Sequence, residues 1–290
     1  MSGDRRSVVV TGASTGIGRA TAKALVEQGL RVFGSVRKQA DAASLREEFG
    51  GEVQPLLFDV TDGEAIAEAV STVQEALGDT TLAGLVNNAG VALPGAMMHQ
   101  PIDELRRVFE INVFGLVAVT QAFLPLLGAR RDPAGPPGRV VNISSVSGRL
   151  SVPFLGAYAA SKHAVEALSD ALRRELMIYG IDVIVVQPGA IETPIWDKAE
   201  VLDLGPYAHT DYAPILRNFQ QLIVTQGRRG LPASRVGEVV TQALTTARPR
   251  ARYPIPDQPW MGWRIPRLLP DRVLDRALAQ RLGLNELGES

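Results

Sequence analysis

Short runs of β-branched residues alternate with amphipathic segments along most of the chain. The runs that we expect to be strands are Val8–Val10, Val32–Val36, Val53–Phe58, Leu82–Val86, Arg139–Ile143 and Asp182–Val186. The segments that we expect to be helices are Gly18–Gln28, Ala42–Phe49, Asp62–Leu77, Asp103–Leu127 and Ala157–Tyr179. Continuous apolar strands are typical of parallel sheets, whose crossover connections place helices on the sheet faces. The pattern therefore predicts an α/β fold, a doubly wound parallel sheet with helices on both faces.

The segment that ends at Leu77 shows the helical pattern clearly. Thr61 or Asp62 can cap its first turn, and Glu64 suits the positive end of a helix. Apolar residues then recur at helical spacing, at Ile66, Val70, Val73 and Leu77. We expect this face to lie on the sheet.

The regular alternation stops after Pro188. Residues 190–230 contain Gly, Pro and scattered aromatic residues, which suits a mobile lid over a pocket or an ordinary irregular excursion. Residues 256–290 form a Pro- and Trp-containing tail that ends in a helical pattern. We expect one domain over residues 1–255, including the 190–230 lid, and a tail over 256–290 whose helix packs on the domain or on a partner subunit.

The composition excludes several kinds of chemistry. The 290 residues include no Cys, which rules out disulfides, thiolate zinc sites, iron–sulfur clusters and a cysteine nucleophile. His99, His163 and His209 are widely spaced, so we expect no metal site. Of the 30 basic residues only four are Lys. Proton chemistry should therefore rely on Tyr, Lys, Ser or carboxylates.

Charge and hydropathy indicate the partners and the location. The net charge of −1 gives no electrostatic footprint for nucleic acid. The polar start of the chain does not resemble a signal peptide, and the longest apolar stretch, Val113–Leu127, is too short to span a bilayer. We expect a cytoplasmic protein. Trp260 and the arginines of the tail could dock on a membrane surface, but packing on the domain or on a partner is the plainer use of that face.

A glycine-rich turn follows the first strand and leads directly into a helix. Glycine lets the backbone approach a pyrophosphate closely, and the start of a helix favours an anion. Glycine also serves plain turns, so the position between a strand and a helix carries the argument. The residues of this turn that we expect to bind a dinucleotide are Gly12, Ser14, Thr15, Gly16, Ile17 and Gly18.

The end of the second strand indicates which dinucleotide is bound. NAD-binding sheets carry an acidic residue there, roughly 20 residues after the glycines, to bind the ribose hydroxyls. This chain has Arg37 and Lys38 instead, which favour the 2′-phosphate of NADP unless they form only a solvated basic loop. We expect NADPH to be preferred over NADH. Asp59 and Val60, after the third strand, should reach the adenine.

Tyr158 and Lys162 are spaced four residues apart within a predicted helix. This spacing places a phenol and an ammonium above one another on one helix face. A surface pair without a function would look the same when taken alone. The neighbouring motifs change that interpretation.

Six motifs together resemble the short-chain dehydrogenase/reductase family, in its simple single-domain branch. They cover roughly residues 7 to 250 and are Thr11-Gly-x-x-x-Gly-Ile-Gly18, Asn87-Asn-Ala-Gly90, Asn112, Ser144-Ser145, Tyr158-x-x-x-Lys162 and Pro188-Gly189 with Thr193. The resemblance implies a Rossmann-type catalytic domain. Two further segments, 32–38 and 248–254, are more loosely similar to the hydroxysteroid and retinol dehydrogenase group.

The resemblance implies four catalytic residues. Tyr158 would be the general acid in reduction and the general base in oxidation, and Lys162 would lower its pKa and hold the nicotinamide ribose. Ser145 would hydrogen-bond the carbonyl or alkoxide oxygen. Asn112 would support a water chain to Lys162, although a buried Asn within an apolar helix can also be a satisfied core residue.

The resemblance also implies contacts with the cofactor and the substrate. The further residues expected at the cofactor are Asn88, Ala89, Gly90, Pro188, Gly189, Ile191 and Thr193. Those expected near the substrate are Leu93, Val146 and Val152, together with apolar members of the lid. The helices that contain Val113 and Tyr158 form the usual subunit interface of the family, so we expect a homodimer or homotetramer.

The sequence therefore predicts a metal-independent, NADP-dependent oxidoreductase. It would transfer hydride between nicotinamide and a hydrophobic ketone, aldehyde or secondary alcohol, with steroids and retinoids among the candidates. One alternative is a reductase of the 3-oxoacyl-carrier-protein type or of another polar carbonyl compound. An alternative of another class is a non-catalytic NADP-sensing protein.

Overall fold

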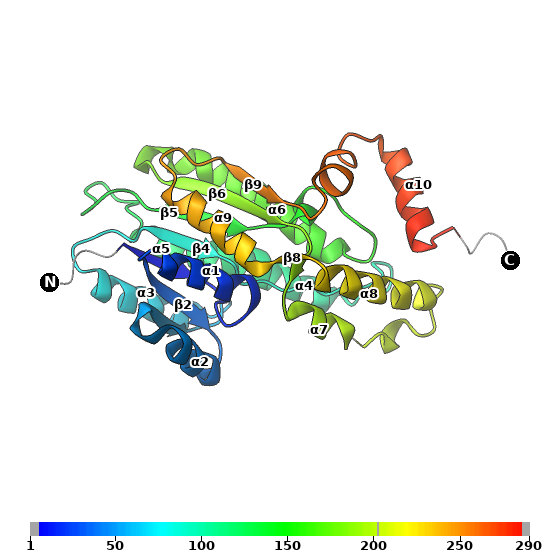
Figure 1. The fold of residues 1–290 in the computed structure, drawn as a ribbon, viewed down its shortest axis with the longest axis horizontal. Coiled ribbons are helices and arrows are strands. Elements are labelled where there is room, and N and C mark those ends of the chain that lie inside the picture. Colours follow the sequence, from blue (N-terminus) through cyan, green and yellow to red (C-terminus); the bar gives the residue numbers. More distant parts are fainter. Residues whose placement is uncertain (1–5, 202, 286–290) are drawn as a thin grey trace.

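Seven parallel strands form the central sheet of the computed structural model, in the order β3-β2-β1-β4-β5-β6-β9 (Figure 1). Their bounds are Ser7–Val10 (β1), Arg31–Val36 (β2), Val53–Leu57 (β3), Gly84–Asn87 (β4), Arg139–Ile143 (β5), Asp182–Pro188 (β6) and Arg252–Ile255 (β9). The structure describes residues 6–201 and 203–285. The polar start of the chain, Leu202 of the predicted lid and the end of the predicted tail lie outside the described residues. The parallel sheet confirms the predicted fold class.

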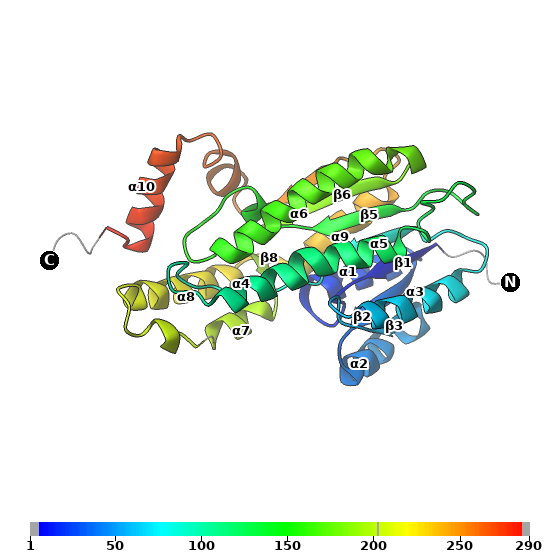
Figure 2. The same cartoon turned by 180° about the vertical axis from the view of Figure 1, so that it is seen from behind.

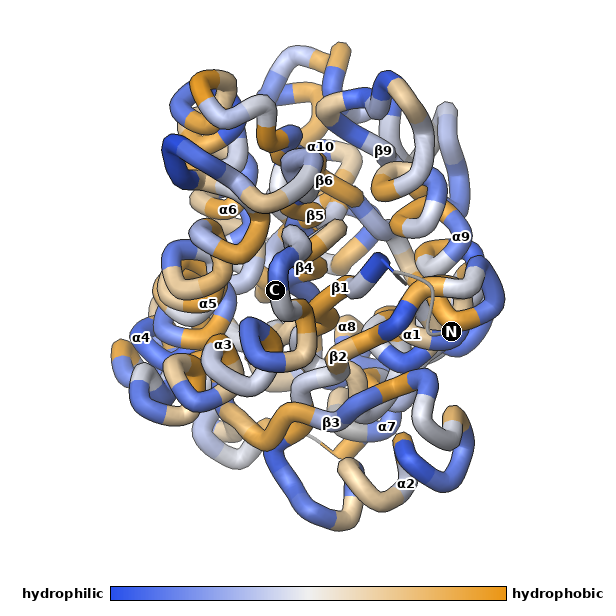
Figure 3. The backbone as a smooth tube through the Cα atoms, turned by 90° about the vertical axis from the view of Figure 1, so that its left-hand side faces the viewer, coloured by the Kyte–Doolittle hydropathy of each residue, from blue (hydrophilic) through white to orange (hydrophobic). Residues whose placement is uncertain are grey.

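Helices cover both faces of this sheet (Figures 1 and 2). Their bounds are Gly16–Glu27 (α1), Gln39–Phe49 (α2), Gly63–Leu77 (α3), Ile102–Phe109 (α4), Leu116–Phe123 (α5), Gly156–Glu175 (α6), Ile195–Glu200 (α7), Ala213–Arg228 (α8), Ala233–Thr245 (α9) and Asp271–Leu282 (α10). Apolar residues of α1, α2 and α9 join one core cluster, and those of α3, α5 and the end of α6 join the other. Seen end-on, the strands form a layer between the helices (Figure 3).

Alternation along β1 shows how the strands serve both cores. Val8 and Val10 belong to the cluster under α1 and α9, whereas Val9 belongs to the cluster under α3 and α5. All three side chains are fully buried. A strand that is apolar at every position thus holds a helix layer on each face.

Helix α3 follows the predicted pattern closely. The Asp62 carboxylate caps it by accepting hydrogen bonds from the N–H groups of Glu64 and Ala65, both at 3.1 Å. Ile66 and Val73 are buried against the sheet, and Val70 and Leu77 are partly buried beside them. The start of the helix and its apolar face are both confirmed.

The segment after β6 is more regular than its composition indicates. It contains α7 and α8, and a second, two-stranded sheet of β7 (Ile191–Glu192) and β8 (Leu231–Pro232). Phe154, Tyr207 and Phe219 belong to an apolar cluster beneath α8. The two helices thus extend the molecule beyond the carboxyl ends of the strands (Figure 1).

The helix predicted over residues 103–127 is divided into three parts. Between α4 and α5, residues Glu110–Gly115 form a π-helical turn, and α5 ends at Phe123. Such turns insert one extra residue per turn and re-aim the side chains around them. Asn112 lies in this turn and is buried.

The C-terminal tail packs against the apolar cluster beneath α8. Residues Pro259–Arg264 form a π-helical turn in which Trp263 is buried and Trp260 is exposed. Helix α10 follows, and Leu282 and Leu284 pack against the cluster beneath α8. None of the helices in the described part of the chain is long and apolar enough to span a bilayer.

Candidate active site

The glycine-rich turn lies between β1 and α1, at the carboxyl edge of the sheet. Gly12 and Gly16 adopt φ values of +65° and +56°, which favour glycine. A Cβ atom at Gly18 would collide with the carbonyl oxygen of Gly12 and with the side chain of Asn88. The side chain of Thr15, at the N-cap of α1, makes no hydrogen bond to the helix. The turn therefore presents backbone N–H groups that an anion can approach.

The segment after β4 holds this turn in place. The Asn88 amide donates to the carbonyl oxygens of Thr11 (2.9 Å) and Gly12 (3.1 Å). The Thr11 hydroxyl accepts from the backbone N–H groups of Asn88 and Ala89. Ser35, at the end of β2, accepts from the N–H of Gly12 at 3.0 Å. Three neighbouring strands thus fix one turn.

Arg37 follows β2 directly, and Arg19 of α1 contacts helix α2. Arg37 is largely exposed, and its guanidinium lies 3.6 Å from the carboxylate of Asp59. Lys38 is exposed at the N-cap of α2. Arg19, which the sequence interpretation missed, donates to the Ser14 carbonyl at 3.1 Å and to the Ser44 hydroxyl at 3.0 Å, and pairs with Glu48. The signal that could have revealed Arg19 is its position directly after Gly18.

Tyr158 and Lys162 lie in the first turns of α6, where Ser145 approaches them from the end of β5. The Tyr158 hydroxyl is hydrogen-bonded to the Ser145 side chain. The Lys162 ammonium lies 5.8 Å from the centre of the Tyr158 ring and donates to the carbonyl oxygen of Ile143 at 2.9 Å. Ser145 is buried and accepts from the N–H of Ser147. Three of the four predicted catalytic residues are thus neighbours.

Burial sets the protonation of this group. It raises the pKa of Tyr158 above the ordinary value, while the hydrogen bond with Ser145 acts in the opposite direction. Burial lowers the pKa of Lys162 to about 8, and the negative charge of Glu166 opposes that shift. At pH 7 the phenol is therefore protonated and the amine is mostly an ammonium.

Asn112, the fourth predicted catalytic residue, is satisfied by protein groups. Its carbonyl oxygen accepts from the N–H of Val91 at 2.8 Å, and its amide donates to the carbonyl oxygen of Val91 and to the Ser161 hydroxyl. A Cβ atom at Gly90 would lie 3.1 Å from the Asn112 oxygen and 3.7 Å from the Lys162 ammonium. Asn112 thus links the loop after β4 to α6 beside Lys162. Because its amide bonds protein groups, it is a satisfied core residue.

The segment after β6 lies at the same carboxyl edge of the sheet. The Ser145 hydroxyl donates to the carbonyl oxygen of Pro188 at 3.4 Å, and Gly189 packs against residues 256 and 257. A Cβ atom at Gly16 would lie 3.2 Å from the Thr193 side chain, so this segment meets the glycine-rich turn. Ile191 is turned into the core beneath α9, which leaves only its backbone for a ligand.

The remaining predicted residues lie in the segments that follow β3, β4 and β5. Val60 is buried against the π-helical turn, where a Cβ atom at Gly115 would meet it. Leu93, Val146 and Val152 are each half-buried. Val146 follows Ser145 directly, and Val152 precedes Phe154, whose ring packs against Tyr212 and Phe219. Gly95, two residues after Leu93, donates its N–H to the Phe154 carbonyl oxygen at 2.8 Å.

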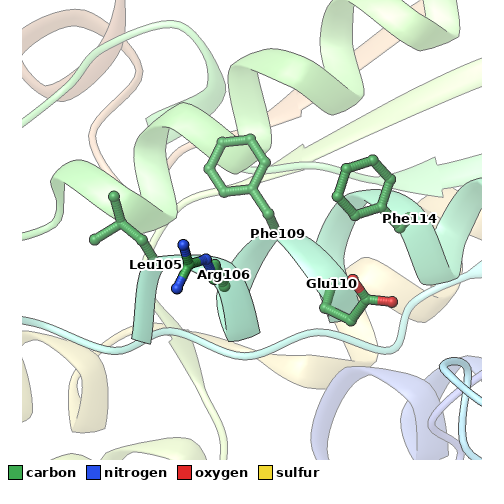
Figure 4. A pocket seen from close by; sticks show the side chains of 5 residues that line it. All are labelled: Leu105, Arg106, Phe109, Glu110 and Phe114. Atoms are coloured by element: carbon green, nitrogen blue, oxygen red, sulfur yellow. The ribbon is translucent and has the colours of Figure 1, made fainter. Parts of the chain in front are cut away.

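One open hollow lies away from these residues. It has a volume of about 360 Å³ and is lined by Leu105, Arg106, Phe109, Glu110 and Phe114. Figure 4 shows the two phenylalanines and Leu105 pointing to the same side of the helix. None of the predicted site residues lines this hollow.

Comparisons with known proteins agree with the geometry. A model of the short chain dehydrogenase family matches residues 6–201. The chain is 44% identical to an NADPH-dependent 3-dehydrocapnine reductase of Ornithobacterium rhinotracheale, over 93% of this chain and 95% of that protein. It is 34% identical to mouse retinol dehydrogenase 16, over 85% of this chain and 79% of that protein. The structure of a short-chain dehydrogenase from Streptomyces avermitilis superposes with a TM-score of 0.72 at 30% identity and covers all of both chains.

Proposed function

The chain belongs to the short-chain dehydrogenase family, and we propose that it reduces a hydrophobic ketone or aldehyde with NADPH. The family assignment makes it an oxidoreductase that acts on alcohol or carbonyl groups with a nicotinamide dinucleotide. The single observation that carries the proposal is the group formed by Ser145, Tyr158 and Lys162 beside the glycine-rich turn. This group supplies a proton donor, a hydroxyl for the reacting oxygen and a positive charge.

The cofactor that the family uses fits the turn on physical grounds. Gly18 lets the start of α1 pack closely against the Gly12 carbonyl and the Asn88 side chain, which fixes the turn, and the start of α1 offers uncapped N–H groups to a pyrophosphate. We propose that Gly12, Ser14, Thr15, Gly16 and Ile17 hold the phosphates and that Asn88, Ala89 and Gly90 pack on the nucleotide. When bound, the nicotinamide supplies the hydride for reduction.

The protein groups then have distinct tasks. Tyr158 donates its hydroxyl proton to the carbonyl oxygen as the carbonyl carbon gains a hydride, so the product is the alcohol and Tyr158 is left as a phenolate. Ser145 hydrogen-bonds the same oxygen and orients it. The Lys162 ammonium stabilises the phenolate by its charge. A phenol whose pKa is raised by burial stays protonated at neutral pH and suits this acid role.

We further propose that NADPH is preferred over NADH. Arg37 and Lys38 lie where an acidic residue would otherwise bind the ribose hydroxyls, and Arg37 is exposed enough to turn toward a 2′-phosphate. A relative that covers nearly the whole chain is described as NADPH-dependent. Both observations support a binding site for the 2′-phosphate.

The proposed substrate is hydrophobic because its surroundings are. Val152 lies two residues before Phe154, which belongs to an apolar cluster with Phe219. Gly95, two residues after Leu93, donates to the Phe154 carbonyl oxygen at 2.8 Å, so both segments lead to apolar surroundings. The similarity to retinol dehydrogenases supports the same class of substrate. A homo-oligomer and a cytoplasmic location stay predictions from the sequence.

The substitution Tyr158→Phe tests the proposed function. Purified protein is assayed for NADPH consumption with steroid, retinoid, acyl and small aromatic carbonyl compounds. Loss of a general acid should lower kcat roughly 10²- to 10⁴-fold while NADPH binding changes little. Tyr179→Phe, at an exposed position at the end of the same helical segment, serves as the control and should leave kcat unchanged.

The panel also separates the alternatives. Turnover of polar acyl compounds alone would replace the hydrophobic substrate by a polar one. Wild-type turnover by the Phe variant would refute the assignment of Tyr158. NADPH binding without turnover of any carbonyl compound would favour a nucleotide-sensing protein.

A further inference from the structure

Glu166 is a buried carboxylate one helical turn beyond Lys162. Only 4% of its surface is exposed, and both of its oxygens are engaged. One oxygen accepts from the Gln187 amide of β6 at 2.9 Å. The other accepts from the Arg252 guanidinium of β9 at 2.9 Å and lies 3.2 Å from the guanidinium of Arg149. A charge buried with so many partners is costly to remove and is fixed in position.

Arg149 belongs to the turn that begins at Ser145. The Ser145 side chain caps this 3₁₀ turn, Val146–Gly148, and the N–H of Arg149 closes it by bonding the Val146 carbonyl. A Cβ atom at Gly148 would lie 2.7 Å from the Ser144 hydroxyl and 3.1 Å from the Glu166 side chain. The turn is therefore pressed against α6, and the pair of Arg149 and Glu166 is the ionic contact that holds it there.

The charges around Lys162 are unevenly placed. On α6 the titratable neighbours are Tyr158 and Glu166, followed one turn later by Asp170, which pairs with Arg252 at 2.8 Å and with Arg173 at 2.9 Å. Arg149 approaches from the turn after β5, and Arg252 approaches from β9. From the π-helical turn the neutral side chain of Asn112 lies near Lys162. Glu166 is thus the negative charge nearest to the ammonium along the helix.

We propose that Glu166 is a positioning residue: it holds the Ser145 turn on the catalytic helix through Arg149 and places a fixed negative charge beside Lys162. The inference rests on the proposed roles of Ser145, Tyr158 and Lys162. Substrate and cofactor never touch Glu166 in this proposal. Its effect reaches the reaction through the distance between Ser145 and Tyr158 and through the charge of Lys162.

The titration of Lys162 tests the effect of the Glu166 charge on the ammonium, and it needs no substrate. Because the chain has only four lysines, selective ¹³C labelling gives four side-chain signals, and Lys162→Arg identifies the one from Lys162. This signal should titrate with a midpoint near 8 in the unmodified protein. In Glu166→Gln the midpoint should fall by roughly one pH unit, because an opposing negative charge is removed while the shape is kept.

Asp170→Asn is the matched control for that measurement. It also removes a carboxylate that pairs with Arg252, but one helical turn farther from Lys162. The midpoint should move much less in this variant than in Glu166→Gln. Equal shifts in the two variants, or no shift in either, would overturn the role assigned to the Glu166 charge.

Arg149→Met tests whether the Ser145 turn must be held on α6. It keeps Glu166 paired with Arg252 and Gln187. With a carbonyl substrate found in the panel, we expect kcat to fall about tenfold, because Ser145 and Tyr158 lose their fixed separation, and KM for NADPH to stay within about twofold. Arg235→Met, at an exposed position on α9, is the control. Unchanged kcat in Arg149→Met would refute the coupling.

The two sets of measurements separate the inference from the function on which it rests. If no carbonyl compound is reduced, the proposed function fails, and the lysine titration still decides the effect of Glu166. If the wild type is active and the variants match it, the inference alone fails. Thermal unfolding of each variant shows that the fold is retained, and Arg149→Met provides a second variant if Glu166→Gln does not fold.

Discussion

Arg37 carries most of the proposed choice between the two dinucleotides. Its guanidinium already lies near the carboxylate of Asp59, so the same side chain can balance a nearby negative charge or bind a phosphate. Arg19 cannot easily take its place because three protein groups hold it: the Ser14 carbonyl, the Ser44 hydroxyl and Glu48. A bidentate guanidinium suits a phosphate, and no acidic side chain can replace it.

The substitution Arg37→Asp should therefore change cofactor preference. We expect the ratio of kcat/KM for NADPH over NADH to fall roughly 10- to 100-fold, the value of a charge-assisted hydrogen bond, because the new carboxylate repels the phosphate and suits the ribose hydroxyls. Steady-state kinetics with both cofactors give the ratio. Arg276→Asp, exposed on α10, carries the same change of charge and should leave the ratio as it is. Equal use of both cofactors by the unmodified protein would contradict the proposal.

Individual residues of the site were predictable where their type and spacing were unusual. Tyr158 and Lys162 stand out because the chain contains few tyrosines and four lysines. Arg19 and Glu166 were not predictable in this way. Both belong to abundant residue types, and their roles depend on partners distant in sequence, such as Glu48 and Arg252. Such pairs exist only once the strands and helices are packed.

At the scale of elements, the π-helical turn between α4 and α5 determines where the Asn112 side chain lies. It places Asn112 so that its amide makes both a donated and an accepted hydrogen bond with the backbone of Val91. An uninterrupted α-helix of the same sequence would rotate this side chain away from Val91. The turn thus links the loop after β4 to α6, through Ser161, beside Lys162.

Removal of the Asn112 side chain should uncouple these two elements. In Asn112→Ala the backbone groups of Val91 lose their partners in the interior, so we expect the free energy of unfolding to fall by about 1–3 kcal/mol. We also expect kcat to fall, because Lys162 lies beside the disturbed loop. Urea unfolding and kinetics measure the two effects. The same change at Asn218, exposed on α8, is the control, and a loss of equal size there would show that the bonds to Val91 are unimportant.

Elements with strong periodicity were predicted well, and the others were not. Helix α3 and the first strands have apolar patterns that match their burial. Strand β9 contains Arg252 and Pro254 and pairs only with β6 at the edge of the sheet, so its sequence lacks the apolar run of a central strand. Helix α8 begins at Ala213, contains Pro214 in its first turn and follows a Gly- and Pro-containing segment. The composition of this region is therefore that of a loop. The π-helical turn has no periodic signal, because the apolar pattern continues through it.

At the scale of the whole molecule, the outer face of α4 and of the π-helical turn after it exposes apolar side chains. Phe114 is 58% exposed and lines the hollow with Phe109 and Leu105 (Figure 4). Leu168 of α6 is also exposed on the neighbouring helix. Exposed apolar residues that gather on one face usually mark an interface. The face coincides with the helices that the family resemblance assigns to the contact between subunits.

A charged residue on this face should separate the subunits. In Phe114→Glu the carboxylate would be buried in the proposed interface without a partner, so we expect the mass measured by light scattering at micromolar concentration to fall to that of a single chain of 31.1 kDa. Leu268→Glu introduces the same charge at a position that is 83% exposed in the tail, and it should leave the assembly intact. The proposed catalytic groups of each chain lie within that chain, so the separated form should keep the proposed NADPH site. If Phe114→Glu is still a dimer or tetramer, the subunits meet at another face. If the wild-type protein is already a monomer, the prediction of a homo-oligomer is wrong.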